Sequence, residues 1–298
     1  MKKSVSYWSF PGGLENTAPY GPVFARAREL GFQAVECAYA AEGVISPGTT
    51  EAECLRIREE AREAGVEIAS LATGVYWSVP LTAGSPEVRA KAIEHTKNML
   101  RIARWLGTDA ILVVPGAVDV FFSPGSEVVS YDVAWDRARE SVGECLGEAR
   151  RQRVAICVEN VWNKFLLSPL EMKRFVDQFR SKWVKCYFDT GNVIPFGYPE
   201  QWIRILGRRI ARVHLKDHKW RFVPDVAKVP GFEGFARGAA WGTMGAFCDL
   251  GAGDVDWPAV VSALREAGYD GYLTAEMLPP SEGLLERTSA DMDRILER

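Results

Sequence analysis

Short apolar runs alternate with amphipathic segments eight times along the chain. The apolar runs have the length and β-branched content of buried strands, and the segments between them show the 3.6-residue periodicity of helices. The expected strands are 4–10, 34–39, 67–74, 110–116, 155–160, 184–189, 211–217 and 272–278. The expected helices are 21–30, 50–64, 86–106, 133–151, 169–179, 199–208, 257–267 and 282–296.

Polar residues precede several of these helices, and glycines follow several of them. The expected N-terminal caps are Thr50, Ser85, Ser168 and Asp256. The expected left-handed C-terminal caps are Gly31, Gly65, Gly107 and Gly268. Strict alternation predicts parallel strands with right-handed crossovers. Eight such units close naturally into a (β/α)8 TIM barrel, an α/β fold, and we expect residues 1–298 to form this single domain. An open sheet is disfavoured because the glycines after Phe10 do not form a GxGxxG turn.

One connection is much longer than the others. Between the seventh strand and its helix, residues 218–253 lack clear periodicity and are rich in aromatic residues. Long loops in compact domains usually form lids or binding loops, so we expect this one to cover the strand ends. A partly ordered insertion or an oligomer contact is the alternative.

Composition narrows the class of protein. The chain has 47% apolar and 25% charged residues, a net charge of -3 and a pI of about 5.8, with both signs of charge mixed along it. This argues against a nucleic-acid or anionic-membrane surface. The six cysteines form no CxxC pair and are expected to be reduced thiols. No signal-peptide core is present, and no stretch approaches the roughly 18 apolar residues of a membrane span, so we expect a cytoplasmic protein.

Four expected strands carry an ionisable residue near their C-terminal ends: Glu159, Asp189, His214 and Glu276. Such residues face the mouth of a barrel and could converge on one divalent cation. Oxygen-rich ligation with one imidazole suits Mn²⁺, Mg²⁺ or Co²⁺ better than structural zinc. Alternatively, the carboxyls could be partly protonated or paired with Lys216 or Arg221.

The strand-end motifs resemble those of the sugar phosphate isomerase/epimerase superfamily, whose fold is the xylose isomerase-like barrel. The matching motifs are VEN (158–160), DTGN (189–192), HLKD (214–217), AEM (275–277) and LGAGDVDW (250–257). The resemblance spans nearly the whole chain. It implies that Glu159 and Glu276 are both metal ligands and acid/base residues, with Asp189 and His214 completing the site. Type-2 apurinic endonucleases in this superfamily use a zinc cluster that needs more histidines than the three present here.

The expected function is therefore metal-dependent epimerisation or isomerisation of a small sugar or sugar phosphate through an enediolate. Two alternatives stay open: a lyase or dehydratase acting on a keto-polyol or keto-glycoside, and a sugar-binding subunit that needs a partner chain. We also expect a homo-oligomer, with aromatic residues of the long connection at the interface.

Further residues are candidates for contacting the substrate. Lys216 is the preferred hydroxyl or phosphate contact because it should point to the same side of its strand as His214. Glu36 could bind a sugar hydroxyl or be a satisfied barrel carboxylate, and Asn192 could contact the substrate or form a turn. The remaining candidates are Trp8, Trp77 and Trp162 as apolar walls, and His218 and Arg221 from the long connection.

Overall fold

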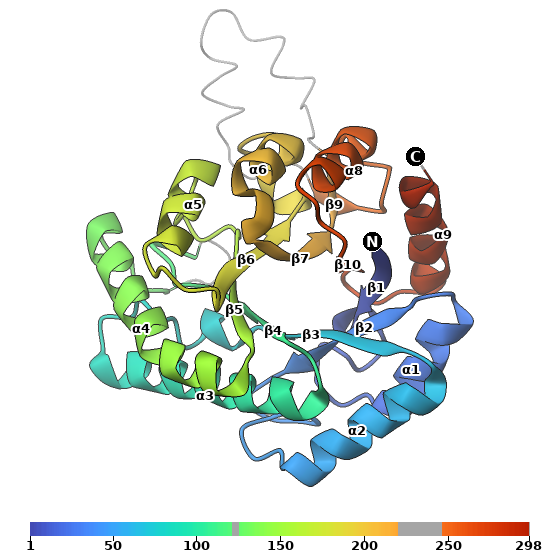
Figure 1. The fold of residues 1–298 in the computed structure, drawn as a ribbon, viewed down its shortest axis with the longest axis horizontal. Helices are drawn as coiled ribbons and strands as arrows, with labels where there is room; N and C mark the ends of the chain where they lie inside the picture. The colour runs from blue at the N-terminus through green and yellow to red at the C-terminus, as the bar shows by residue number, and fades with distance from the viewer. Residues whose placement is uncertain (121–124, 220–245, 298) are drawn as a thin grey trace, which may run out of the picture.

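A computed structural model describes residues 1–120, 125–219 and 246–297. Within these residues, eight parallel strands close into a barrel in the order β1-β10-β7-β6-β5-β4-β3-β2. The strands are β1 (Lys2–Ser6), β2 (Ala34–Tyr39), β3 (Glu67–Thr73), β4 (Ala110–Val113), β5 (Ala155–Glu159), β6 (Val184–Asp189), β7 (Ile210–Leu215) and β10 (Tyr272–Ala275). The first strand pairs with the last one, which closes the ring (Figure 1). The predicted (β/α)8 barrel is confirmed.

Helices surround the strands on the outside of the barrel (Figure 1). They are α1 (Tyr20–Glu29), α2 (Glu51–Ala64), α3 (Pro86–Leu106), α4 (Tyr131–Gln152), α5 (Pro169–Asp177), α6 (Pro199–Leu206), α8 (Trp257–Glu266) and α9 (Leu284–Leu296). The predicted N-terminal caps all accept a backbone hydrogen bond, and Thr50 forms a full capping box with Glu53. The four predicted C-terminal glycines have positive φ angles.

The first strand is shorter than its sequence suggests. It ends at Ser6, and a 3₁₀ turn over Tyr7–Ser9 follows, with the Ser6 side chain accepting from the backbone N–H of Trp8 at 3.4 Å. This turn places Trp8 at the rim of the barrel instead of within its wall. The aromatic content of SVSYWSF mimics a longer strand because apolar runs do not reveal where the backbone turns.

The long connection contains a small sheet at its two ends. Strand β8 (Asp217–Lys219) pairs antiparallel with β9 (Ala246–Cys248), where the sequence shows no clear periodicity. Most of the predicted lid, including Arg221, lies outside the described residues, so its covering role stays a prediction.

Apolar side chains from strands and helices form one continuous buried core. Five of the six cysteines are buried and all six are free thiols, as expected. Across the described part of the chain, the helices lack the length and apolar character needed to cross a membrane.

Candidate active site

The four predicted ligands meet at the C-terminal end of the barrel. Glu159 and Asp189 are the last residues of β5 and β6, His214 lies near the end of β7, and Glu276 directly follows β10. One ligand atom of each lies within 4.8 Å of all the others, and all four side chains are buried. His214 Nδ1 is 3.0 Å from Glu276 Oε2 and 3.1 Å from Glu159 Oε1. Parallel strands thus bring together residues that are far apart in the sequence.

Glu36 orients the imidazole of His214. Its carboxylate is fully buried and lies 2.8 Å from His214 Nε2, while it also accepts hydrogen bonds from Ser70 and Tyr187. A carboxylate beside Nε2 favours a proton on that nitrogen, and its charge contributes to the raised pKa of His214. His214 Nδ1 is thereby directed at the three ligand carboxylates, as in the carboxylate–histidine pairs of metal sites.

Paired asparagines fix the ends of β5 and β6. Asn160 Nδ2 donates to the carbonyl of Asp189 at 2.9 Å, and the backbone N–H of Asp189 donates back to Asn160 Oδ1 at 2.9 Å. Asn192 donates from its backbone to Asp189 Oδ1 and from its side chain to the carbonyl of Asn160. These bonds satisfy buried polar groups that the strand ladder no longer reaches and hold Glu159 and Asp189 in register.

The turn after β6 also clasps the end of β7. Thr190 Oγ1 donates to the carbonyl of Lys216 at 2.8 Å and accepts from its backbone N–H at 3.1 Å. A Cβ atom at Gly191 would lie 2.6 Å from Lys216 Cβ, so this close approach requires glycine. The clasp directs the ammonium of Lys216 to Glu276 Oε2 at 2.6 Å and Asp189 Oδ2 at 3.2 Å.

Asp217 holds the stretch before α8 against the barrel. Its fully buried carboxylate accepts from the backbone N–H groups of Gly251, Gly253 and Val255 and from Trp257 Nε1. A Cβ at Gly253 would lie 1.9 Å from Asp217 Oδ1, which explains a glycine at this position. The LGAGDVDW stretch is therefore a support for the strand end that carries His214 and Lys216.

Burial and neighbouring charges shift the pKa values of the two glutamates in opposite directions. Burial raises the pKa of Glu159 to about 7, against the opposing effect of its hydrogen bond with His214. Burial also disfavours ionisation of Glu276, but the charges of Lys216 and His214 outweigh it and lower the pKa of Glu276 to about 2. Burial raises the pKa of Asp189. For His214, burial opposes protonation, yet Glu36 and Glu276 raise its pKa well above the usual value.

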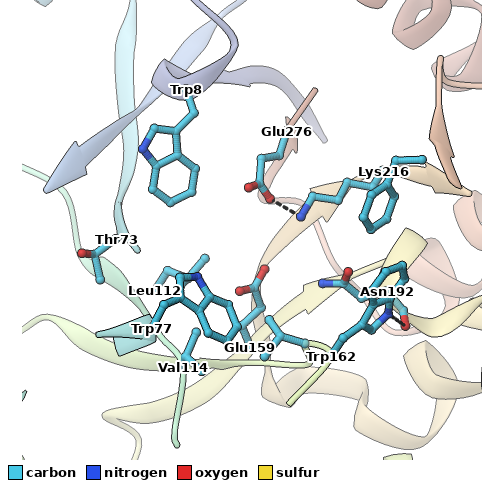
Figure 2. Close-up of a pocket in the computed structure, with 12 residues that line it drawn as sticks. Trp8, Thr73, Trp77, Leu112, Val114, Glu159, Trp162, Asn192, Lys216 and Glu276 are labelled. Atoms are coloured by element: carbon cyan, nitrogen blue, oxygen red, sulfur yellow. Dashed lines mark hydrogen bonds and ion pairs between the residues drawn. The ribbon is translucent and has the colours of Figure 1, made fainter. Parts of the chain in front are cut away.

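A cavity of about 330 Å³ opens above the ligands. Figure 2 shows Glu159 and Glu276 near its centre, with Trp8 and Trp77 on one side and Trp162 on the other. Its lining residues are Trp8, Thr73, Trp77, Leu112, Val114, Glu159, Val161, Trp162, Asn192, Lys216, Phe247 and Glu276. Aromatic faces around polar groups suit the apolar faces and hydroxyls of a sugar.

The structure brings most predicted substrate contacts to this cavity. Trp8, Trp162, Lys216 and Asn192 line it, and Lys216 does lie on the same side as His214. Glu36 does not line it: β2 continues to Tyr39, so Glu36 lies below the cavity as the satisfied carboxylate that was the alternative expectation.

His218 supports the wall from behind. Its ring packs edge-on against Trp162 and Phe247, which stack on each other with centroids 5.0 Å apart. Trp162 is fixed further by a hydrogen bond from Nε1 to the carbonyl of Asn192 at 3.0 Å.

Sequence reasoning missed several residues of the site. Tyr187 and Ser70 hold Glu36, and Leu112 and Val114 line the cavity. Tyr187 could have been found, because it precedes Asp189 by two residues and so shares its side of the strand. Ser70, Leu112 and Val114 carry no comparable signal, since they resemble ordinary strand residues.

The donor set fits a divalent cation. Three ligand carboxylates and Glu36 outnumber the positive charges of Lys216 and His214, and the ligands offer oxygen with one imidazole. Asp189 Oδ2 and Glu276 Oε2 form ion pairs with Lys216, yet neither accepts a well-directed hydrogen bond within the described residues. A cation at this cluster would satisfy both atoms.

Comparison with known proteins agrees with the fold and the site. The family model described as xylose isomerase-like TIM barrel matches residues 24–295. An Escherichia coli (strain K12) protein with the provisional name L-ribulose-5-phosphate 3-epimerase is 27% identical over 218 residues, covering 72% of this chain and 68% of that protein. Inosose dehydratase of Clostridium perfringens (strain 13 / Type A) is 24% identical over 222 residues, covering 71% and 69%.

A solved structure shows the same fold at lower identity. D-Psicose 3-epimerase from Clostridium cellulolyticum H10, determined with D-tagatose, superimposes with a TM-score of 0.76 at 19% identity and covers 99% of both chains. The family match covers most of the sequence and the strand order is that of the barrel. This chain belongs to the xylose isomerase-like TIM barrel family.

Proposed function

We propose that the chain is a divalent-metal-dependent sugar epimerase or isomerase in which Glu159 and Glu276 transfer a proton through an enediolate. The observation that carries this proposal is the presence of two glutamates in one buried ligand cluster, both reaching the same cavity. A merely structural metal site would not need two carboxylates that open onto a sugar-sized cavity. The epimerase and dehydratase relatives support the same class of chemistry.

A divalent cation bound by Glu159, Asp189, His214 and Glu276 would polarise the carbonyl of a ketose and acidify the adjacent C–H bond. The protein's own groups then move the proton. One glutamate accepts it, which leaves an enediolate, and the other returns a proton. Return to the same carbon from the opposite face inverts it, and return to the neighbouring carbon isomerises the sugar.

Other groups hold the sugar and its developing charge. The ammonium of Lys216 lies 2.6 Å from Glu276 Oε2, close enough to donate to a substrate oxygen at that carboxylate. Trp8 and Trp162 lie on different sides of the cavity, where their aromatic faces would pack on the sugar ring (Figure 2). Asn192 forms hydrogen bonds with Trp162 and Asn160, so its role is to hold these residues in position at the cavity.

Deuterium exchange tests the proposal. Purified protein with Mg²⁺ in D₂O is incubated with free ketoses and their phosphates, and incorporation is followed by NMR. We expect metal-dependent exchange at the carbon next to the carbonyl, removed by chelation and restored by added metal. Epimerase activity without exchange of that proton would contradict the mechanism, because a carbon deprotonated by one glutamate and reprotonated by the other receives a different proton.

Elimination is the second candidate, and the inosose dehydratase relatives favour it. The same enediolate expels a leaving group from the neighbouring carbon instead of being reprotonated, so the first half of the chemistry is shared. Mass spectrometry separates the two candidates, since dehydration lowers the product mass whereas epimerisation and isomerisation leave it unchanged.

The proposal includes the finer expectations from the sequence. We propose Mn²⁺, Mg²⁺ or Co²⁺ as the bound ion because the ligands are mainly oxygens. We also propose a cytoplasmic homo-oligomer that acts on a small sugar or sugar ester and does not bind nucleic acid. Metal analysis of the purified chain and light scattering test the ion and the assembly.

A further inference from the structure

A second cavity adjoins the first one on the far side of Phe247. Its volume is about 240 Å³. It is lined by Lys216, Asp217, Phe247, Cys248, Asp249, Glu276, Met277, Leu278, Pro279, Ser281 and Leu284. Lys216, Phe247 and Glu276 line both cavities, so one proposed acid/base residue is reached from two sides.

Phe247 and Lys216 form the partition between the two cavities. The Lys216 ammonium lies 5.4 Å from the centre of the Phe247 ring, which stacks on Trp162 of the first cavity. Phe247 is 43% exposed although it belongs to an ordered strand pair. Phe247 therefore separates the two cavities while its ring is held by Trp162 and Lys216.

The second cavity favours an uncharged, largely apolar occupant. Met277, Leu278 and Pro279 supply apolar walls from the segment between β10 and α9, and Leu284 supplies one from the start of α9. Leu278 is 40% exposed. An apolar group placed against the Leu278 side chain would remove its exposed surface from water, which is favourable.

The charges in both cavities disfavour a phosphate ester. Asp249 and Glu276 line the second cavity, and a phosphate there would lie near these carboxylates, although Arg287 pairs with Asp249 at 3.1 Å and Lys216 pairs with Glu276. Among the described residues that line the two cavities, Lys216 is the sole lysine or arginine, and Glu276 and Asp189 already engage it. A bidentate arginine or a cluster of cations would be expected for phosphate.

We infer that the substrate is an uncharged keto-glycoside whose sugar ring occupies the first cavity and whose apolar aglycone occupies the second. This inference rests on the proposed function and narrows its substrate class. Proton transfer occurs on the sugar ring between Glu159 and Glu276, and the aglycone contributes binding energy away from the reacting carbon.

Ligand binding tests the inference without requiring turnover. The Mg²⁺-loaded full chain is titrated by calorimetry with 3-keto-D-glucose, phenyl 3-keto-β-D-glucoside and 3-keto-D-glucose 6-phosphate, and then with the matching set derived from D-galactose. We expect the phenyl glycoside of at least one set to bind about tenfold or more tightly than its free sugar, with no gain from the phosphate.

Variants that fill the second cavity test whether the phenyl group binds there and causes the tighter binding of the glycoside. Leu278→Trp and Ser281→Trp place an indole there from exposed positions, and each should bring the glycoside-to-sugar affinity ratio close to one. Leu55→Trp on the exposed face of α2 is the matched control and should keep the wild-type ratio. The inference is wrong if the phosphates bind best, if no set shows the gain, or if the gain survives both filling variants.

Exchange measurements separate this inference from the proposed function. If the phenyl glycoside binds more tightly than its free sugar but no keto-glycoside exchanges deuterium, the two-part substrate site is supported and the enediolate chemistry is contradicted. A chain that exchanges deuterium with a free ketose but shows no phenyl gain supports the chemistry and overturns the two-part site.

Discussion

The two halves of the barrel mouth differ in how they are held together. Strands β10, β7, β6 and β5 are adjacent and carry polar side chains joined by hydrogen bonds and ion pairs. Strands β4, β3, β2 and β1 complete the ring and, with their following turns, present Trp8, Trp77, Leu112 and Val114 to the cavity. We call these the ligand half and the wall half.

Glu36 crosses the boundary between the halves. It belongs to β2 in the wall half, yet its carboxylate reaches His214 in the ligand half. The ligand half depends on hydrogen bonds between particular atoms, whereas the wall half depends on shape and apolar area. Substitutions that keep the side-chain shape but change its hydrogen-bonding groups should therefore impair the function of the ligand half. In the wall half, a loss of function should require removal of side-chain volume.

The largest effect is expected for the two glutamates of the ligand half. Glu159→Gln and Glu276→Gln keep the side-chain shape but remove the proton-transfer group, so each should slow deuterium exchange by about 10² to 10⁴-fold. Exchange is followed by NMR in D₂O, and bound metal is measured in parallel. Glu282→Gln, an exposed change near the same mouth, should retain wild-type exchange. Wild-type exchange in both glutamate variants would contradict the assigned roles.

Glu36→Gln should weaken metal binding by about 10 to 100-fold while the fold is retained. An amide in place of the carboxylate no longer stabilises a proton on His214 Nε2 as strongly, so Nδ1 is less well fixed toward the ligands. Metal affinity is measured by calorimetry and the tautomer by ¹⁵N NMR of His214. Tyr187→Phe removes one donor to Glu36 and should give a smaller change in the same direction.

Glu63→Gln is the matched control for Glu36→Gln, because Glu63 is exposed on α2. It should leave metal affinity and the His214 spectrum unchanged. If Glu36→Gln lowers thermal stability but leaves both the affinity and the tautomer at wild-type values, the carboxylate is a core group without a part in positioning the imidazole.

Trp8→Ala tests the wall half. The substitution removes an aromatic face from the cavity, so KM should rise by about tenfold, with a smaller change in kcat because the proton-transfer groups stay in place. Steady-state kinetics on the substrate found by the exchange screen gives both constants. Trp183→Ala, next to the first residue of β6 at the opposite end of the barrel, is the control and should leave KM unchanged. A drop in kcat alone would assign Trp8 to catalysis instead.

The fold and the position of the four candidate ligands could be predicted from sequence because their signals are local. Helical periodicity, capping residues and glycine stops mark each βα unit, and a carboxylate that ends a buried apolar run stands out. Glu159, Asp189 and Glu276 all have this signature. Closure of the barrel then follows from the number of units, so convergence of the ligands required no knowledge of long-range contacts.

The position of Glu36, the β8–β9 pair and the second cavity depend on contacts between distant segments, which a single sequence does not show. Glu36 looks like a strand-end carboxylate, but the length of β2 and the partners Ser70 and Tyr187 decide that it lies below the cavity. The pairing of β8 with β9 has no periodic signal, because three-residue strands are too short to show one. The second cavity likewise arises only when the segment after β10 meets Phe247.

The smallest effect concerns a buried histidine behind the wall half. His95 on α3 is 6% exposed, and its Nδ1 lies 2.7 Å from the hydroxyl of Tyr39 at the end of β2. Burial lowers the pKa of His95, with Lys91 acting in the same direction and Glu94 opposing it. The folded chain therefore resists protonation at a pH where the unfolded chain already binds a proton.

The sign of the pH effect follows from linkage. Because the folded-state pKa lies below the unfolded value of about 6.5, His95 leaves stability intact above that pH and lowers it as the pH falls below. His95→Gln keeps a polar group near Tyr39 but cannot titrate. In urea unfolding at pH 8 and pH 5.5, the wild type should lose more free energy of unfolding than the variant. The paired comparison cancels the titration of His214 and Glu159, which both chains share, so equal losses would place the proton-resisting group elsewhere in the chain.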